Sequence, residues 1–261
     1  MQQDTSRRNF IKLSSAGIGG LLMSFQADTK GRLAGIPSSK SKKLKIVCVG
    51  AHPGDPEFGC GGTMARYSDA GHLVTFLYLT RGEAFDEHKT HKEAAELRTR
   101  EADVACKVLN TVPRFVGQID GDTVLSHDMN QAMLDILQDE QPDMVFSQWP
   151  IDGHMDHQVA GLLALNAWMK MKKTFELYFY EVNTGSETMA FTPSDYVDIS
   201  GVMKKKHDAM YAHQSQEPDR TYKTFFKQME DFRGLEAGVP AAEAFVHFGS
   251  KTSSDIIMFN R

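Results

Sequence analysis

The sequence is poor in cysteine and contains no C-x-x-C pair. Its three cysteines, Cys48, Cys60 and Cys106, are odd in number in a chain of 261 residues. A disulfide scaffold or a structural zinc cluster needs more thiols at closer spacing, so we expect three buried single thiols. A chain of this length without such cross-links has to depend on a full hydrophobic core.

An excess of basic residues is also missing. The chain has 29 Lys and Arg against 34 Asp and Glu, a net charge of -5, and the two signs are mixed along it. Binding to a phosphate backbone needs a basic stripe, which this pattern does not provide. We therefore expect a small molecule or a glycan as the partner, and no nucleic acid.

The amino terminus lacks an apolar run that would span a membrane. Residues 13–25 are modestly apolar and rich in Gly and Ser, and a stable spanning helix needs about 20 apolar residues. Residues 6–12, S-R-R-N-F-I-K, are typical of a twin-arginine export signal. We expect 1–43 to be signal and linker, and 44–261 to be one domain, periplasmic and without a membrane span after export. The alternative is a basic amphipathic start to a cytosolic domain.

Short apolar runs alternate with segments of helical spacing through most of the chain. The expected strands are 44–49, 72–80, 114–119, 143–148, 177–182 and 196–199. The expected helices are 88–110, 128–140, a segment that follows His157 and reaches Ala167, and 202–213. This order predicts an α/β fold, Rossmann-like, with a mostly parallel sheet and helices on both faces. In the tail after Ser215, only residues 241–245 have the pattern of an ordered segment.

Polar loops follow the first and the fourth expected strands, at residues 51–57 and 149–157. Because the carboxyl ends of parallel strands meet at one edge of a sheet, we expect the two loops to lie together. His52 and Asp55 in the first loop and His157 in the second match a catalytic zinc site, which has three protein ligands and an open position. We predict Zn²⁺ there, or another divalent metal.

These loops resemble the PIG-L and LmbE-like zinc N-deacetylases. The family reads A-H-P-D-D-E after its first strand, and residues 51–57 read A-H-P-G-D-P-E. Its H-x-D-H motif is met by residues 154–157, H-M-D-H, and its R-x-x-E motif by residues 98–101, R-T-R-E. The similarity covers most of residues 44–170 and implies an LmbE-like fold.

The resemblance also implies roles for individual residues. His52, Asp55 and His157 match the family's zinc ligands. His154 matches the histidine that stabilises or protonates the tetrahedral intermediate, and Asp156 would orient His154. The family's general base is the first Asp of its D-D pair, and the matching position in this sequence is Gly54.

We therefore expect another carboxylate to act as the base. Asp152 lies two residues before His154 on the same loop, and the hypothesis is that it reaches the attacking water from the opposite wall. Glu57 is the second candidate. The alternative role of Asp152 is to cap the helix that begins near His154, because Asp is a favoured residue just before a helix.

Two arginines are candidates for substrate binding. Arg98 matches the family's substrate contact, with a surface salt bridge to Glu96 or Glu101 as the alternative. Arg81, in the turn after the second strand, is the weaker candidate.

Together these observations predict an exported zinc-dependent hydrolase that removes an N-acetyl group from an N-acetylglucosamine-type sugar or glycoconjugate. The alternative is a glycan-binding pseudoenzyme of the same fold, inactive because Gly54 replaces the usual base. Residues 59–62, G-C-G-G, lack the spacing of a dinucleotide-binding loop, so a nucleotide or methyl-donor enzyme is only weakly indicated.

Overall fold

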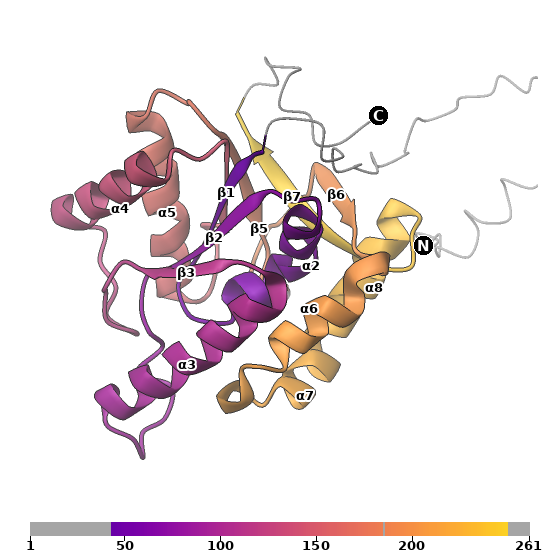
Figure 1. The fold of residues 1–261 in the computed structure, drawn as a ribbon, viewed down its shortest axis with the longest axis horizontal. Helices are drawn as coiled ribbons and strands as arrows, with labels where there is room; N and C mark the ends of the chain where they lie inside the picture. The colour runs from indigo at the N-terminus through magenta and orange to yellow at the C-terminus, as the bar shows by residue number, and fades with distance from the viewer. Residues whose placement is uncertain (1–42, 185, 250–261) are drawn as a thin grey trace, which may run out of the picture.

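A computed structural model describes residues 43–184 and 186–249, and the expected signal and linker lie almost entirely outside them. One seven-stranded sheet runs through the described chain in the order β3-β2-β1-β4-β5-β7-β6. Helices cover both of its faces (Figure 1). The strands are β1 (Lys45–Gly50), β2 (Leu73–Tyr78), β3 (Val112–Phe115), β4 (Met144–Gln148), β5 (Glu176–Tyr180), β6 (Asp195–Asp198) and β7 (Ala242–Phe248).

The helices alternate with the strands along the chain. The longer ones are α2 (Asp55–Asp69), α3 (His91–Leu109), α4 (His127–Glu140), α5 (Met155–Lys170), α6 (Met203–Met210) and α8 (Lys227–Ala237). Short helical segments are η1 (Ser200–Val202), η2 (Gln214–Gln216), α7 (Pro218–Thr221) and η3 (Tyr222–Phe226), the last a π-helix. None of the helices in the described ranges is long and apolar enough to cross a membrane.

The two faces of the sheet carry separate cores, because side chains alternate along each strand. On one face Ile46 and Cys48 of β1 pack with α2, α3 and α6. On the other face Val47 and Val49 pack with α4 and α5. The predicted α/β class, the mostly parallel sheet and the two helical layers are confirmed.

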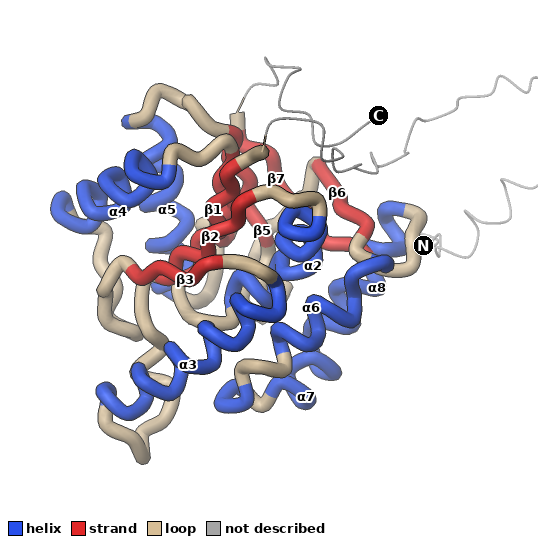
Figure 2. Tube along the Cα trace, viewed as in Figure 1, coloured by secondary structure: helices blue, strands red, loops and turns tan. Residues whose placement is uncertain are grey.

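The first five strands of the sheet run parallel, in the order β3-β2-β1-β4-β5. The chain first adds strands to one side of β1 and then crosses to β4 on its other side. Ligands of open α/β sheets bind at such a reversal, beyond the carboxyl ends of the strands. The loops that follow β1 and β4 therefore occupy the expected position for a site. Figure 2 shows the red strands at the centre of the molecule, with blue helices on both sides and tan loops joining them.

The sequence prediction was wrong in several places. The third strand is at Val112–Phe115, two residues earlier than its predicted start, and runs on into a loop. The tail was expected to be ordered only at residues 241–245, which lie almost entirely in the seven-residue strand β7, but it also contains the helix α8. β7 pairs antiparallel with both β5 and β6, and such pairing of distant segments leaves little local signal.

Candidate active site

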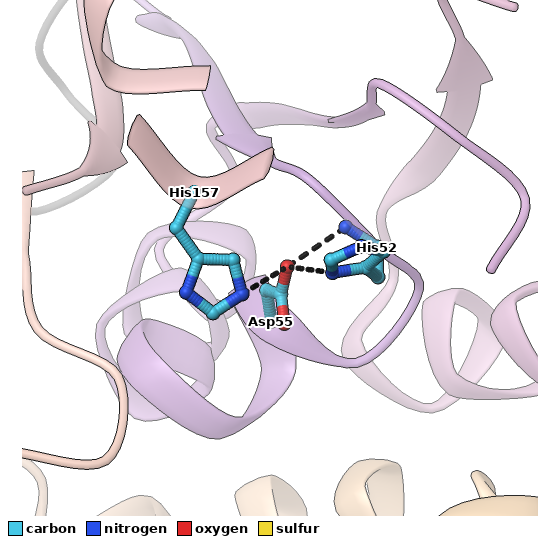
Figure 3. Close-up of side chains that lie close together, drawn as sticks. All are labelled: His52, Asp55 and His157. Carbon is cyan, nitrogen blue, oxygen red and sulfur yellow. Dashed lines mark hydrogen bonds and ion pairs between the residues drawn. The ribbon is translucent and has the colours of Figure 1, made fainter. Parts of the chain in front are cut away.

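Two turns place three side chains against one another. His52 lies in the turn that follows β1, and Asp55 is the first residue of α2. His157 lies in the first turn of α5, after the loop that follows β4. The three side chains point toward one another in Figure 3, and each offers one ligand atom within 4.8 Å of the others. The structure thus brings together the three residues that the sequence predicted as a metal site.

The distances within this group suit a small cation. Asp55 Oδ2 lies 3.2 Å from His52 Nδ1 and 3.6 Å from His157 Nε2. Two ligand atoms bonded to a tetrahedral zinc at about 2.0–2.1 Å lie about 3.3 Å apart. These two separations fall on either side of that value, and the ligand atoms of His52 and His157 lie within 4.8 Å of each other, so the three atoms can approach one ion.

Behind each imidazole lies a carboxylate. His157 Nδ1 is 3.2 Å from Asp152 Oδ1, and His52 Nε2 is 3.0 Å from Asp120 Oδ1 and 3.1 Å from Asp156 Oδ2. Such partners hold the proton on the rear nitrogen and leave the front nitrogen free as a ligand, as in carboxylate–histidine–metal relays. The donor set and its supports therefore fit a divalent metal.

The charges of this cluster shift the acidity of its members. Burial lowers the pKa of His52, but the carboxylates of Asp55, Asp120 and Asp156 outweigh burial and hold it well above its ordinary value. Burial raises the pKa of Asp55, yet the charges of His157 and His52 bring it far below the ordinary range. The imidazoles and carboxylates of this cluster thus stabilise one another's charged forms.

Asp152 has a different position from the one that the base hypothesis requires. Its Oδ1 accepts from the His154 backbone N–H at 2.9 Å and faces His157 Nδ1, while its Oδ2 accepts from Thr188 Oγ1 at 2.8 Å. The residue is buried and does not line the cavity. Both of its oxygens are therefore engaged, and the geometry supports an orienting role toward His157.

Asp156 also has a partner other than the predicted one. Its carboxylate bonds to His52 Nε2, to the Gly121 backbone N–H at 2.8 Å and to Thr123 Oγ1 at 2.6 Å. It therefore positions His52, whereas the sequence analysis expected it to orient His154. Asp156 forms its hydrogen bond to His154 through its backbone N–H, which donates to His154 Nδ1 at 3.3 Å.

His154 lies directly beside the histidine ligand candidates. Its ring stacks on that of His157 with centroids 4.6 Å apart, and it lies 4.8 Å from the His52 ring. Burial and the charges of His157 and His52 lower its pKa. Because Nδ1 accepts the backbone N–H of Asp156, the ring proton of the neutral form belongs on Nε2.

A cavity of about 320 Å³ opens over the three clustered side chains. Its wall includes the aromatic rings of Phe58, Phe85 and Phe226, and the polar side chains of Arg98 and Asn183. Its volume lies at the lower end of the range typical of small-molecule sites, about 300–1,000 Å³.

The two candidate arginines differ in position. Arg98 is buried, lines the cavity and donates from Nη2 to the Pro53 carbonyl. The salt-bridge alternative is wrong for the described residues, in which no ion pair involves Arg98, and Glu101 accepts from Ser215 instead. Arg81 bonds to Thr99 and stacks 4.0 Å over the Phe115 ring, and it does not line the cavity.

Three other carboxylates surround the site. Glu57, the second base candidate, is fully buried and accepts from Tyr78, from the Gly54 backbone and from His213. Asp120 and Glu187 line the cavity, and the sequence analysis identified neither. They lie on loops without a motif, so only the folded chain shows their proximity.

Comparisons with known proteins agree with this geometry. Residues 47–168 match the family described as PIG-L, GlcNAc-PI de-N-acetylase. The diacetylchitobiose deacetylase of Thermococcus kodakarensis is 28% identical over 191 residues, 67% of this chain and 71% of that protein.

Solved structures share the fold. The conserved protein TT1542 from Thermus thermophilus is 30% identical, with a TM-score of 0.68 over 79% of this chain and 95% of that one. The 4-carboxy-2-hydroxymuconate hydratase GalB from Pseudomonas putida is 21% identical, with a TM-score of 0.70 over 82% of this chain and 100% of that one. GalB shows the fold alone, since the fold by itself does not determine the chemistry. By its sequence match and its site, the chain belongs to the metal-dependent PIG-L/LmbE-like family of N-deacetylases, hydrolases of non-peptide C–N bonds.

Proposed function

We propose that this protein is a zinc-dependent deacetylase of an N-acetylglucosamine-type sugar or glycoconjugate. One observation carries the proposal: two imidazoles and a carboxylate converge, and each imidazole has a carboxylate behind it. A histidine with a purely structural role needs one such hydrogen-bond partner. That role does not explain why the second nitrogens of two histidines point to the same place.

His52, Asp55 and His157 would hold the metal. Two imidazole nitrogens and one carboxylate oxygen are a donor set that suits Zn²⁺ among the common divalent ions. A bound ion at this position supplies Lewis-acid chemistry, which polarises the acetyl carbonyl and activates water. In this scheme Asp152 and Asp156 are positioning residues, since they fix the two rings through their rear nitrogens.

His154 is the candidate for stabilising the oxyanion. The backbone N–H of Asp156 occupies Nδ1, so Nε2 carries a proton that it can donate to the developing negative charge on the acetyl oxygen. Removal of a single donor of this kind costs about 10²–10³ in kcat in other acyl-transfer enzymes. Arg98 secures the loop between His52 and Asp55 by its bond to the Pro53 carbonyl.

The substrate class is supported by the cavity and by the relatives. A volume of about 320 Å³ suits one sugar unit with its acetamido group, and phenylalanine rings can pack against the apolar face of a sugar. The relative from Thermococcus is named a diacetylchitobiose deacetylase. Diacetylchitobiose also contains an N-acetylated sugar.

We further propose that the protein is exported by the twin-arginine route and works in the periplasm. Arg7, Arg8 and the Phe10-Ile11-Lys12 sequence support this proposal. They lie outside the described residues.

Acetate release is the direct test of the proposed activity. The purified protein is incubated with a panel of N-acetylhexosamine glycans, after removal of metal by a chelator and after restoration with Zn²⁺. We expect release from at least one glycan, its loss without metal, and its return with Zn²⁺. Glycan binding without any acetate release would favour the pseudoenzyme instead.

A further inference from the structure

Two of the three cysteines lie side by side in the core. Cys48 is in β1 and Cys60 is in α2, and their Sγ atoms are 3.1 Å apart although the residues are twelve positions apart in the sequence. Both side chains are fully buried. The third cysteine, Cys106 in α3, contacts the Tyr78 hydroxyl at 3.7 Å. The fold therefore brings one pair of thiols together and leaves the third thiol with a different neighbour.

The usual roles of a free cysteine do not explain this pair. A buried thiol commonly packs as a small apolar side chain, but such packing does not require two thiols to face one another. A hydrogen bond between them is weak, because sulfur is a weak donor and a weak acceptor. None of the groups of possible metal ligands in the described part of the chain contains a cysteine.

A disulfide between these thiols requires only a small movement. An S–S bond is about 2.05 Å long, so the two Sγ atoms would have to approach by about 1 Å. The backbone of α2 departs from helical dihedral angles at Cys60, with φ −144° and ψ 21°. Because this break lies at one of the two residues that have to move, the adjustment does not have to distort a regular helical turn.

The bond would close a ring that contains the loop of the candidate metal site. Residues 48–60 include the end of β1, His52, Asp55 and the first turn of α2. Both ends of the ring belong to the same buried cluster on one face of the sheet. A cross-link at these ends would join the strand to the helix and would stabilise the fold by restricting the unfolded chain.

We propose that Cys48 and Cys60 are a redox pair that hydrogen peroxide converts to an intrachain disulfide, which stabilises the fold. One sulfur attacks a peroxide oxygen, the O–O bond breaks, and a sulfenic acid and one water form. The second thiol then attacks the sulfenic sulfur, the S–S bond forms, and a second water leaves. The two thiols are oxidised and the peroxide is reduced. This inference does not depend on the proposed deacetylase activity.

Burial determines the conditions of the test. It raises the pKa of both thiols, and the thiolate is the form that reacts. We therefore expect slow oxidation, so the reduced full-length protein is incubated with hydrogen peroxide at mildly alkaline pH over several hours. The peroxide is then removed, and the protein is unfolded in urea and alkylated with iodoacetamide.

A single peptide reports the bond. Trypsin cleaves after Lys and Arg, and residues 46–66 contain neither before Arg66, so both cysteines fall in one peptide. In the treated wild type we expect this peptide to be unalkylated and lighter by two hydrogen atoms, and Cys106 to be alkylated. The melting temperature of the treated protein should rise by about 5–10 °C. Dithiothreitol should reverse both changes, because it reduces disulfides by thiol exchange and does not repair oxidised methionine.

Cys106→Ala is the matched control, because it removes the buried thiol that lies outside the pair, and it should respond to peroxide as the wild type does. Cys60→Ala should show neither the bond nor the rise in melting temperature. If Cys60→Ala does not fold, the peptide from the wild type decides alone. Alkylation of all three cysteines in the treated wild type, a cross-link that includes Cys106, or a disulfide that lowers the melting temperature would overturn the proposal.

Discussion

Replacing Asp152 with Asn tests whether this residue positions a metal ligand or acts as a base. In the wild type, Asp152 Oδ1 faces His157 Nδ1 and the His154 N–H. The Asn side chain keeps the shape of Asp but loses its charge. Two hydrogen bonds to a charged acceptor become bonds to a neutral one, at a cost of about 1 kcal/mol each. The amide –NH₂ also replaces the oxygen that accepts from Thr188 Oγ1.

The bond to the His154 N–H is made with or without Zn²⁺ and affects stability, so only the bond to His157 bears on affinity, and its cost of about 1 kcal/mol corresponds to a roughly fivefold loss. A less firmly held ring adds to this, since changes behind a metal-bound histidine commonly cost about 10–100-fold in metal affinity. We therefore expect Asp152→Asn to bind Zn²⁺ about 10–100-fold more weakly. Activity should fall at limiting Zn²⁺ and recover largely when Zn²⁺ is in excess.

Chelator competition measures the Zn²⁺ affinity, and acetate release is followed as a function of free Zn²⁺. The base hypothesis from the sequence predicts the opposite pattern, with low activity at every Zn²⁺ concentration and an unchanged affinity. That pattern would refute the positioning role that the geometry supports.

Two further predictions concern stability. Lys206 is fully buried with Glu230 and Glu243 each 2.8 Å from its Nζ, so Glu230→Gln should destabilise the fold by about 3–5 kcal/mol in urea unfolding at pH 7. Burial raises the pKa of Glu230, but Lys206 and His207 outweigh it and lower the pKa from 4.5 to about 2. The stabilisation is therefore present above pH 4.5 and lost as the pH falls toward 2. The difference in unfolding free energy between wild type and Glu230→Gln should shrink across that window, and a constant difference would contradict this account. Gly59→Ala should lower the melting temperature measured by circular dichroism, because its Cβ would lie 2.5 Å from the Tyr180 ring and 2.9 Å from the Glu181 carbonyl oxygen, a clash that costs about 1–3 kcal/mol. Gly201→Ala, with open space around the added Cβ, is the control and should melt close to the wild type.

The sequence was sufficient to predict the part of the fold that local patterns determine. Continuous apolar runs at β1 and β4 and the polar loops after them predicted both the parallel sheet and the meeting of His52, Asp55 and His157. Residues 241–245 were predicted to be ordered, but their place as β7 between β5 and β6 was not, because it is determined by pairing over long separations.

The sequence did not predict the roles of the carboxylates around the two histidines. Spacing indicated that Asp152 and Asp156 lie near the histidines, but not which ring nitrogen each would face. Asp120 and Glu187 come from loops that approach the site only when the sheet is formed. The direction of a side chain depends on tertiary packing, so motif residues were found more readily than their roles.

Crystals of the protein with Zn²⁺, measured for anomalous scattering at the zinc edge, test the central claim most directly. The account predicts one strong peak about 2.0–2.2 Å from His52 Nδ1, His157 Nε2 and a carboxylate oxygen of Asp55. A peak bound by other residues, or no peak in this cavity at saturating Zn²⁺, would contradict it.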